Sequence, residues 1–125
     1  MSHKTIKITG YIFTAVLTFL FGMSAFMKLT QDPTALEQAG GIGFSPQTYV
    51  AIGVIELISL VLFIIPRTGL LGSLLLIAYM GGAIVTHLQH QQSIAMAVGV
   101  QVFLWITVAL RFPEIHKRLL TPSKI

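Results

Sequence analysis

GVIELISLVLFIIPRTGLLGSLLLIAYMGGAIVTHL, residues 53–88, holds two long apolar runs separated by Pro66-Arg67-Thr68. A proline removes a backbone donor and ends a helix, so we interpret this segment as two apolar helices that fold back on each other. With their flanking residues, both runs have the length of about 20 residues that a membrane-spanning helix needs. Glu56, Tyr79 and His87 lie within these runs, and polar side chains at such depth need partners.

Two segments that lack charged side chains extend this pattern to the whole chain. Residues 8–27 contain none, and residues 68–110 contain no Asp, Glu, Lys or Arg. The first segment has room for one span and the second for two. The 125-residue chain is 54% hydrophobic and only 10% charged, unlike a soluble domain. We therefore expect a single all-α domain, an integral membrane four-helix bundle with spans at about residues 8–29, 47–65, 69–88 and 94–112.

The connection between the first two spans is expected to contain a short helix on the membrane surface. Asp32 before Pro33 is a helix start signal, and Gly40-Gly41 is a stop signal. Similar start signals predict the caps of the next three spans at Ser45, Thr68 and Ser93. A brief amphipathic helix, residues 114–120, is expected after the last span.

The basic residues indicate how the bundle is oriented. With a cytoplasmic N-terminus, the cytoplasmic side would carry Lys4, Lys7, Arg67, Arg111, Lys117, Arg118 and Lys124. Only Lys28 would face outward. Basic residues concentrate on the cytoplasmic side of membrane proteins, so we expect both termini there. Because the positive charge reports topology, no nucleic acid partner is expected.

Small residues predict where the helices pack closely. In the third span they recur at every fourth position, at Ala78, Gly82 and Thr86, and the fourth span has Ala95 and Gly99. Such spacing lets two helix backbones approach in a bilayer. We expect these faces to form helix contacts.

The chain contains no cysteine, which excludes disulfides, thiolate metal sites and thiol redox relays within it. A redox role would need a bound cofactor or a partner. His87 and His90 have a spacing that can share a metal ion, but no third ligand is evident beyond Glu56, so no metal site is expected.

Each predicted span contributes one polar side chain to a layer in the middle and outer half of the bundle: Ser24, Glu56, Tyr79 and Gln101. Glu56 and Tyr79 both lie roughly 13 Å below the outer ends of their helices, from the helical rise of about 1.5 Å per residue. Lys28, Thr86 and His87 lie above this layer. Side chains lean toward the N-terminus of a helix, so Glu56 leans outward while Lys28 and His87 lean toward it.

Glu56 and His87 are therefore the candidate catalytic residues, as an acid and a base. The candidate ligand-binding residues are Lys28, Tyr79, Thr86, Gln101 and Ser24. An ionised carboxylate is costly in hydrocarbon, so Glu56 must be paired or protonated. A contact with Lys28 and a contact with His87, direct or through water, both remain open. The structural alternative is that Glu56 only fixes helix packing, and that Lys28 is an interfacial side chain that reaches toward water.

At these residues the chain resembles the DoxX-like family of small four-span bacterial membrane proteins. The matching elements are FGMSAFMKLT at the end of the first span, the segment quoted at the outset, and the closing LRFPEIHK. The resemblance implies a multi-pass protein of the bacterial inner membrane. The family's named member is a subunit of a thiosulfate:quinone oxidoreductase. The matching positions are Lys28, Glu56, Arg67, Thr86 and His87, and the resemblance implies no catalytic assignment for them.

Three functions are compatible with these features. The first is a membrane subunit or accessory protein of a redox or stress-related system, with an outward-facing pocket for an apolar ligand such as a quinone or isoprenoid lipid. It would act with a partner subunit or as a homo-oligomer. The second is a stand-alone lipid-modifying enzyme, such as a proton-shuttling isomerase that uses Glu56 and His87. The third is a non-catalytic membrane assembly protein.

Overall fold

The computed structural model describes residues 2–120, which form helices and no β-strand. The elements are α1 (His3–Leu29), α2 (Pro33–Gly41), α3 (Pro46–Ile64), the 3-10 turn η1 (Pro66–Thr68), α4 (Gly69–Gln89), α5 (Ala95–Arg111) and α6 (Pro113–Leu120). The all-α prediction is confirmed, including the short helix α2 between the first two long helices. Lys124, one of the basic residues used to predict topology, lies outside the described residues.

Local capping explains where the first helices begin. Ser2 accepts a hydrogen bond from the Thr5 amide over 3.1 Å, so α1 starts at His3, earlier than the predicted span. The predicted caps of α2 and α3 are confirmed. Asp32 accepts from the amide of the second residue of α2, and Ser45 accepts from the amide of the third residue of α3.

The later caps differ from the prediction. Thr68 does not cap α4, because its hydroxyl donates to the Leu62 carbonyl over 2.8 Å and ties η1 back to α3. α5 begins at Ala95 with Ile94 in the capping position, while Ser93 accepts only a long 3.4 Å bond from the Ala95 amide. The turn before α5 therefore extends one residue further than expected.

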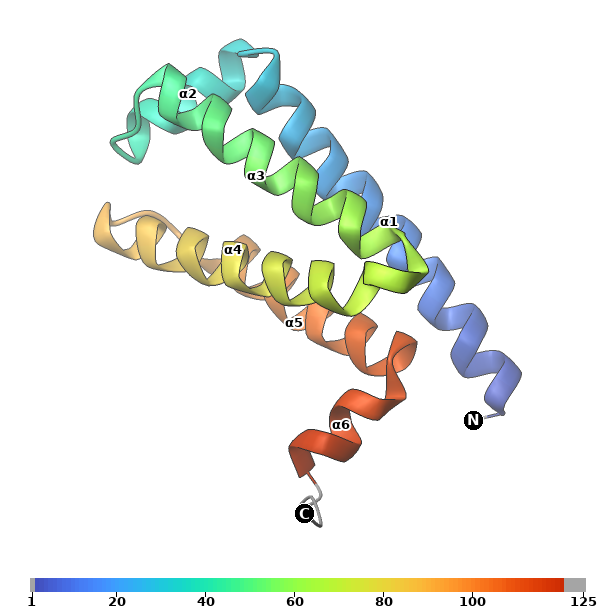
Figure 1. The fold of residues 1–125 in the computed structure, drawn as a ribbon. Coiled ribbons are helices and arrows are strands. Elements are labelled where there is room, and N and C mark those ends of the chain that lie inside the picture. Colours follow the sequence, from blue (N-terminus) through green and yellow to red (C-terminus); the bar gives the residue numbers. More distant parts are fainter. Residues whose placement is uncertain (1, 121–125) are drawn as a thin grey trace.

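The four long helices form two pairs, α1 with α3 and α4 with α5, and the two pairs diverge from each other (Figure 1). α1 packs against α3 and α5, and α4 packs against the same two helices. Figure 1 shows α3 and α4 meeting at η1 and separating toward α2 and the α4–α5 turn. We call the end of the molecule where the pairs are separated the α2 end. The opposite end, which holds η1, the start of α1 and α6, is called the Pro66 end.

One hydrophobic cluster joins the four long helices and includes Phe63, next to the Pro66 end. Side chains from all four long helices are fully buried there, among them Leu17, Phe63, Leu76 and Leu104. Gly72 lets α4 approach α3, because a Cβ at this position would lie 2.1 Å from the Phe63 amide nitrogen. Close packing at this end fixes the angle at which the pairs diverge.

Arg111 adds a polar clamp at the same end. Its guanidinium donates to the carbonyls of Phe63 and Ile64, the latter over 3.1 Å, and so satisfies free acceptors at the end of α3. The guanidinium carbon also lies 4.9 Å from the ring centroids of both Phe63 and Phe112. This side chain therefore joins α5 to α3 where α6 begins.

The expected packing of small residues is wrong for α4 and α5. Apart from the adjoining backbone of the same helix, no atom of the described residues lies within 4 Å of the position that a Cβ would take at Gly82 or Gly99. Ala78, Gly82 and Thr86 instead line a cavity, and Ala95 and Gly99 line a groove between α1 and α5. The reason is that the helix pairs diverge. Where they are apart, the small residues leave open space between the helices instead of letting the backbones approach.

At the α2 end, α2 lies across α1 and α3. Ala35 and Ala39 of α2 are buried together with Tyr49 of α3, and Met27 of α1 packs against this cluster. The small apolar face of α2 thus holds it against both helices, where it covers one side of the space between the pairs.

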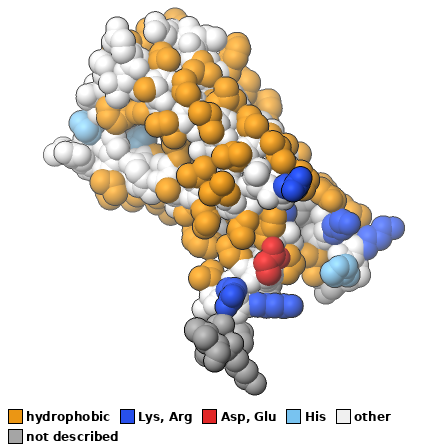
Figure 2. Space-filling model, in the orientation of Figure 1, with side chains coloured by type: hydrophobic (Ala, Val, Ile, Leu, Met, Phe, Trp, Pro, Cys, Tyr) orange, Lys and Arg blue, Asp and Glu red, His pale blue; other side chains and the backbone are white. Residues whose placement is uncertain are grey.

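Within residues 2–120, three helical segments are long and apolar enough to cross a membrane: His3–Leu29, Pro46–Ile64 and Pro66–Gln89. α5 reaches that length only together with α6, which is bent from it by 100°. Figure 2 shows hydrophobic side chains over much of the visible surface and basic side chains gathered at the Pro66 end. These features are those of a membrane protein.

Candidate ligand-binding site

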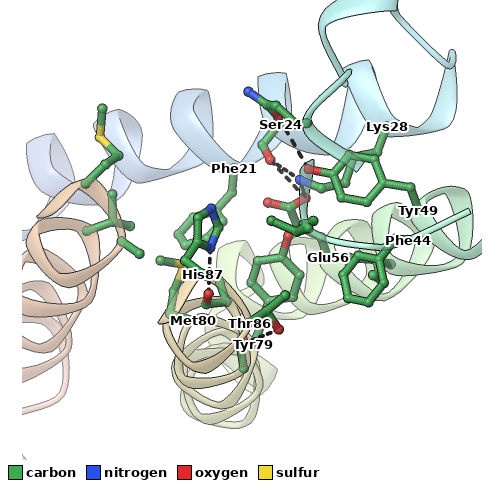
Figure 3. Close-up of a pocket in the computed structure, with 18 of the residues that line it drawn as sticks. Phe21, Ser24, Lys28, Phe44, Tyr49, Glu56, Tyr79, Met80, Thr86 and His87 are labelled. Carbon is green, nitrogen blue, oxygen red and sulfur yellow. Dashed lines mark hydrogen bonds and ion pairs between the residues drawn. The ribbon is translucent and has the colours of Figure 1, made fainter. Parts of the chain in front are cut away.

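A cavity of about 630 Å³ lies between the diverging helix pairs. Its wall contains residues from α1 to α5 and is largely apolar, with Phe21, Ile52, Met80 and Met96 among the lining side chains. The polar side chains on the wall include Ser24, Lys28, Glu56, Tyr79, Thr86 and His87. Figure 3 shows them converging from α1, α3 and α4. A mostly apolar cavity with a few convergent polar groups is the usual form of a small-molecule site.

Lys28 and Glu56 form a buried ion pair on this wall. The distance from Lys28 Nζ to Glu56 Oε1 is 3.0 Å, and the two side chains are 8% and 1% exposed. Ser24 completes a triangle: it accepts from Lys28 over 2.5 Å and donates to Glu56 over 3.1 Å. Two donors therefore converge on one carboxylate oxygen, one from a charged ammonium group and one from a hydroxyl group.

Gly53 makes this pairing sterically accessible. It precedes Glu56 by almost one helical turn, and a Cβ at this glycine would lie 2.8 Å from Lys28 Cβ. Without a side chain at Gly53, the end of α1 approaches α3 closely enough for Lys28 to extend along α3. The contact that the sequence left open is thus made between Glu56 and Lys28.

Two tyrosine rings surround the Lys28 ammonium group. Nζ lies 5.1 Å from the ring centroid of Tyr49 and 5.9 Å from that of Tyr79. An ammonium group near aromatic rings is stabilised by the electron density of the ring faces. The Tyr79 hydroxyl also points toward Glu56 (Figure 3). The Tyr49 hydroxyl donates to Gln38 of α2 over 3.4 Å.

His87 lies on the α4 wall and does not pair with Glu56. Its Nδ1 is 2.6 Å from the Ala83 carbonyl oxygen. A carbonyl only accepts, so Nδ1 carries the proton, and the neutral ring has its lone pair on Nε2. The described part of the chain supplies no hydrogen bond to that nitrogen. His87 can therefore accept a hydrogen bond or a proton from a bound molecule.

The remaining predicted site residues differ in their positions. Thr86 lines the cavity and donates to the Gly82 carbonyl over 2.8 Å. Gln101 does not line it: its amide nitrogen donates to the Ile77 carbonyl over 3.1 Å and ties α5 to α4. Its amide oxygen is buried without a partner among the described residues. Six of the seven predicted residues thus share one cavity, and Gln101 faces a neighbouring helix.

In the part of the chain that the structure describes, no third metal ligand accompanies His87 and His90. His90 bonds to the Thr86 carbonyl through Nδ1 over 3.0 Å. Within residues 2–120, no group of three His, Cys, Asp or Glu side chains is placed to hold a metal ion. The polar groups of the cavity are instead suited to hydrogen bonding with an organic molecule.

Several lining residues were missed by the sequence analysis. Tyr49, Gly53 and Glu56 lie on one face of α3 because of their spacing, so the sequence contained a signal for Tyr49. Gln38, Ile42 and Phe44 also line the cavity, from α2 and the residues after it. No local pattern indicates them, because they reach the site only through the docking of α2.

The α4–α5 turn meets the α2–α3 connection at the α2 end. Gln92 donates to the Gly41 carbonyl over 3.1 Å. Gly43 has a left-handed φ of 79°, and a Cβ there would lie 2.8 Å from a ring nitrogen of His90. These contacts join the two helix pairs across the end of the cavity.

Comparison with known proteins supports one family. The model of the DoxX-like family matches residues 12–110. This match covers every residue of the polar wall described above. No curated protein and no solved structure matches the chain.

Proposed function

We propose that this chain, which belongs to the DoxX-like family, binds an amphipathic ligand, a quinone or an isoprenoid lipid, in the cavity between its helix pairs. In this proposal α1, α3, α4 and α5 all cross a bacterial inner membrane. The Pro66 end faces the cytoplasm together with both termini, because the basic side chains gather there. The cavity then lies in the outer half of the membrane.

The observation that carries the proposal is the Lys28–Glu56 ion pair on the wall of a largely apolar cavity. Taking two charges out of water costs several kcal/mol per ion in proteins. Charged side chains within spans are rare and usually mark a ligand or ion site. A polar head group could bond to Lys28, Glu56 or Tyr79 while its apolar part contacts Phe21 and Met80.

The groups on the two sides of the cavity could also exchange protons with a bound ligand. Glu56 is an acceptor or, once protonated, a donor, and His87 presents a free lone pair at Nε2. Reduction of a quinone takes up two electrons and two protons, and the chain has no cysteine for thiol redox chemistry. In this proposal the electrons come from a partner subunit. Glu56 and His87 Nε2 each take up one proton from water and pass it to one of the two quinone oxygens, which gives the quinol.

The test is extraction of the protein from its membrane in mild detergent, followed by native mass spectrometry and lipid analysis of the bound molecules. We expect a quinone or isoprenoid lipid with the natural chain and its loss with Glu56→Gln. Glu37→Gln is the matched control, because Glu37 is exposed on α2 and does not line the cavity. Retention of the ligand by Glu56→Gln, or an absence of any ligand from the natural chain, argues against the proposal.

The opposed positions of Glu56 and His87 also favour a second function, a stand-alone proton-shuttling isomerase. His87 Nε2 would remove a proton from one carbon of a bound lipid, and a protonated Glu56 would return one to another carbon. This function predicts that the purified protein exchanges lipid hydrogen with deuterium from the solvent without any partner. The redox proposal predicts no such exchange.

A further inference from the structure

A second hollow lies beside the cavity, between α1 and α5. It has a volume of about 370 Å³ and is lined by Val16, Leu20, Met96, Gly99, Val100 and Phe103, together with Ala95. All of these residues are apolar or glycine. The Phe103 ring packs against the Phe13 ring at a tilt of 43°, with ring centroids 4.7 Å apart, so α1 and α5 are in contact on the Pro66 side of this hollow. Above that contact Gly99 leaves space, because nothing lies within 4 Å of its Cβ position. We call this hollow the α1–α5 groove.

The groove adjoins the cavity. Leu20, Met96 and Val100 line both spaces, so these side chains form a shared wall. Leu20 is 44% exposed and Met96 is 79% exposed, so both side chains have free space on one side. Unbranched methionine also changes conformation readily. A chain that leaves the cavity between these side chains would enter the groove.

We propose that the α1–α5 groove holds the hydrocarbon chain of the ligand whose polar head binds at Lys28 and Glu56. This inference rests on the proposed function and narrows it to ligands with one long apolar chain. The two ends of the site match the two ends of such a molecule: charged and tyrosine groups for the head, and only apolar groups for the chain. The groove opens on the outer surface of the bundle, so the hydrocarbon chain can continue from it into the bilayer.

Gly99→Leu tests the groove, because the added side chain fills it. Leucine favours a helix more than glycine does, so the fold should tolerate the change. Gly81→Leu is the matched control: it adds the same side chain to α4, where space is also open, and Gly81 lines neither hollow. The probes are two ubiquinones, one with a single isoprene unit and one with a decyl chain, titrated against each purified variant in detergent.

We expect the natural chain to bind both probes, the long-chain one more tightly. Gly99→Leu should lower the affinity for the long-chain probe about tenfold, because packing contacts are lost. Its affinity for the short-chain probe should stay within about twofold of that of the natural chain. Gly81→Leu should change neither. Equal weakening of both probes, or no effect on either, would overturn the groove assignment while the head site stands. Failure of the natural chain to bind either quinone would overturn the proposed quinone function, and this use of the groove with it.

Discussion

Lys28 at the end of α1 and Glu56 in the middle of α3 form an ion pair that is almost completely removed from solvent. Ser24 bonds to both partners, and the rings of Tyr49 and Tyr79 flank the ammonium group. The pair therefore has the hydrogen bonds that a desolvated charge needs, and it stands at the side of an apolar cavity. Its roles in stability and in binding can be separated by substitution.

Lys28→Met should destabilise the protein more than the double replacement of Lys28 by Met and Glu56 by Leu. The single change leaves a buried carboxylate without its counter-charge, which typically costs about 3–5 kcal/mol. The double change leaves no charge, and apolar replacement of a buried pair is often neutral. Thermal unfolding in detergent measures both variants. A double variant less stable than Lys28→Met would show that the pair itself holds the fold together.

Gly53→Ala should push α1 away from α3 and weaken both the fold and ligand binding. The new methyl group would lie 2.8 Å from Lys28 Cβ, a position that no rotation of a side-chain end can relieve. Overpacking of this kind costs about 1–3 kcal/mol. Gly22→Ala is the matched control on α1, where a Cβ would make an ordinary 3.8 Å contact with Leu60. Equal melting temperatures for the two variants would contradict the close approach at Gly53.

His87 should show the tautomer with the proton on Nδ1. Nitrogen chemical shifts in NMR spectra of the labelled protein distinguish it from the Nε2 tautomer directly. His87→Phe keeps a ring but removes the hydrogen-bond acceptor. It should therefore weaken the binding of a quinol, which carries hydroxyl groups, more than the binding of the matching quinone. The expected difference is about three- to tenfold, the value of one hydrogen bond. Equal loss for both forms would show that His87 contributes only shape.

Gly43→Ala should loosen the contact between the α2–α3 connection and the α4–α5 turn. A left-handed backbone costs a non-glycine residue about 1–2 kcal/mol, and the methyl group would also meet the His90 ring. Gly40→Ala is the control, because nothing lies within 4 Å of its Cβ position. Hydrogen exchange should become faster at residues 41–43 and 90–93 in Gly43→Ala alone. Unchanged exchange there would mean that this contact does not hold the α2 end together.

The sequence alone determined the all-α class, most helix ends and the heights of the polar residues along their own helices. Apolar runs, prolines and capping residues act through neighbours in the chain, so Pro66, Asp32 and Ser45 could be interpreted without a structure. The rise of a helix likewise places Glu56 and Tyr79 at similar depths. For these reasons six of the seven predicted site residues lie around one cavity.

Only the tertiary structure decided which of these groups meet. The position of a residue along a helix does not say which way its side chain faces, and the Gln101 side chain bonds to α4 instead of facing the cavity. The choice of Lys28 over His87 as the partner of Glu56 depends on how closely α1 and α3 pack at Gly53. The cavity and the α1–α5 groove exist because the helix pairs diverge from the Pro66 end, and that angle arises from contacts between side chains far apart in the sequence.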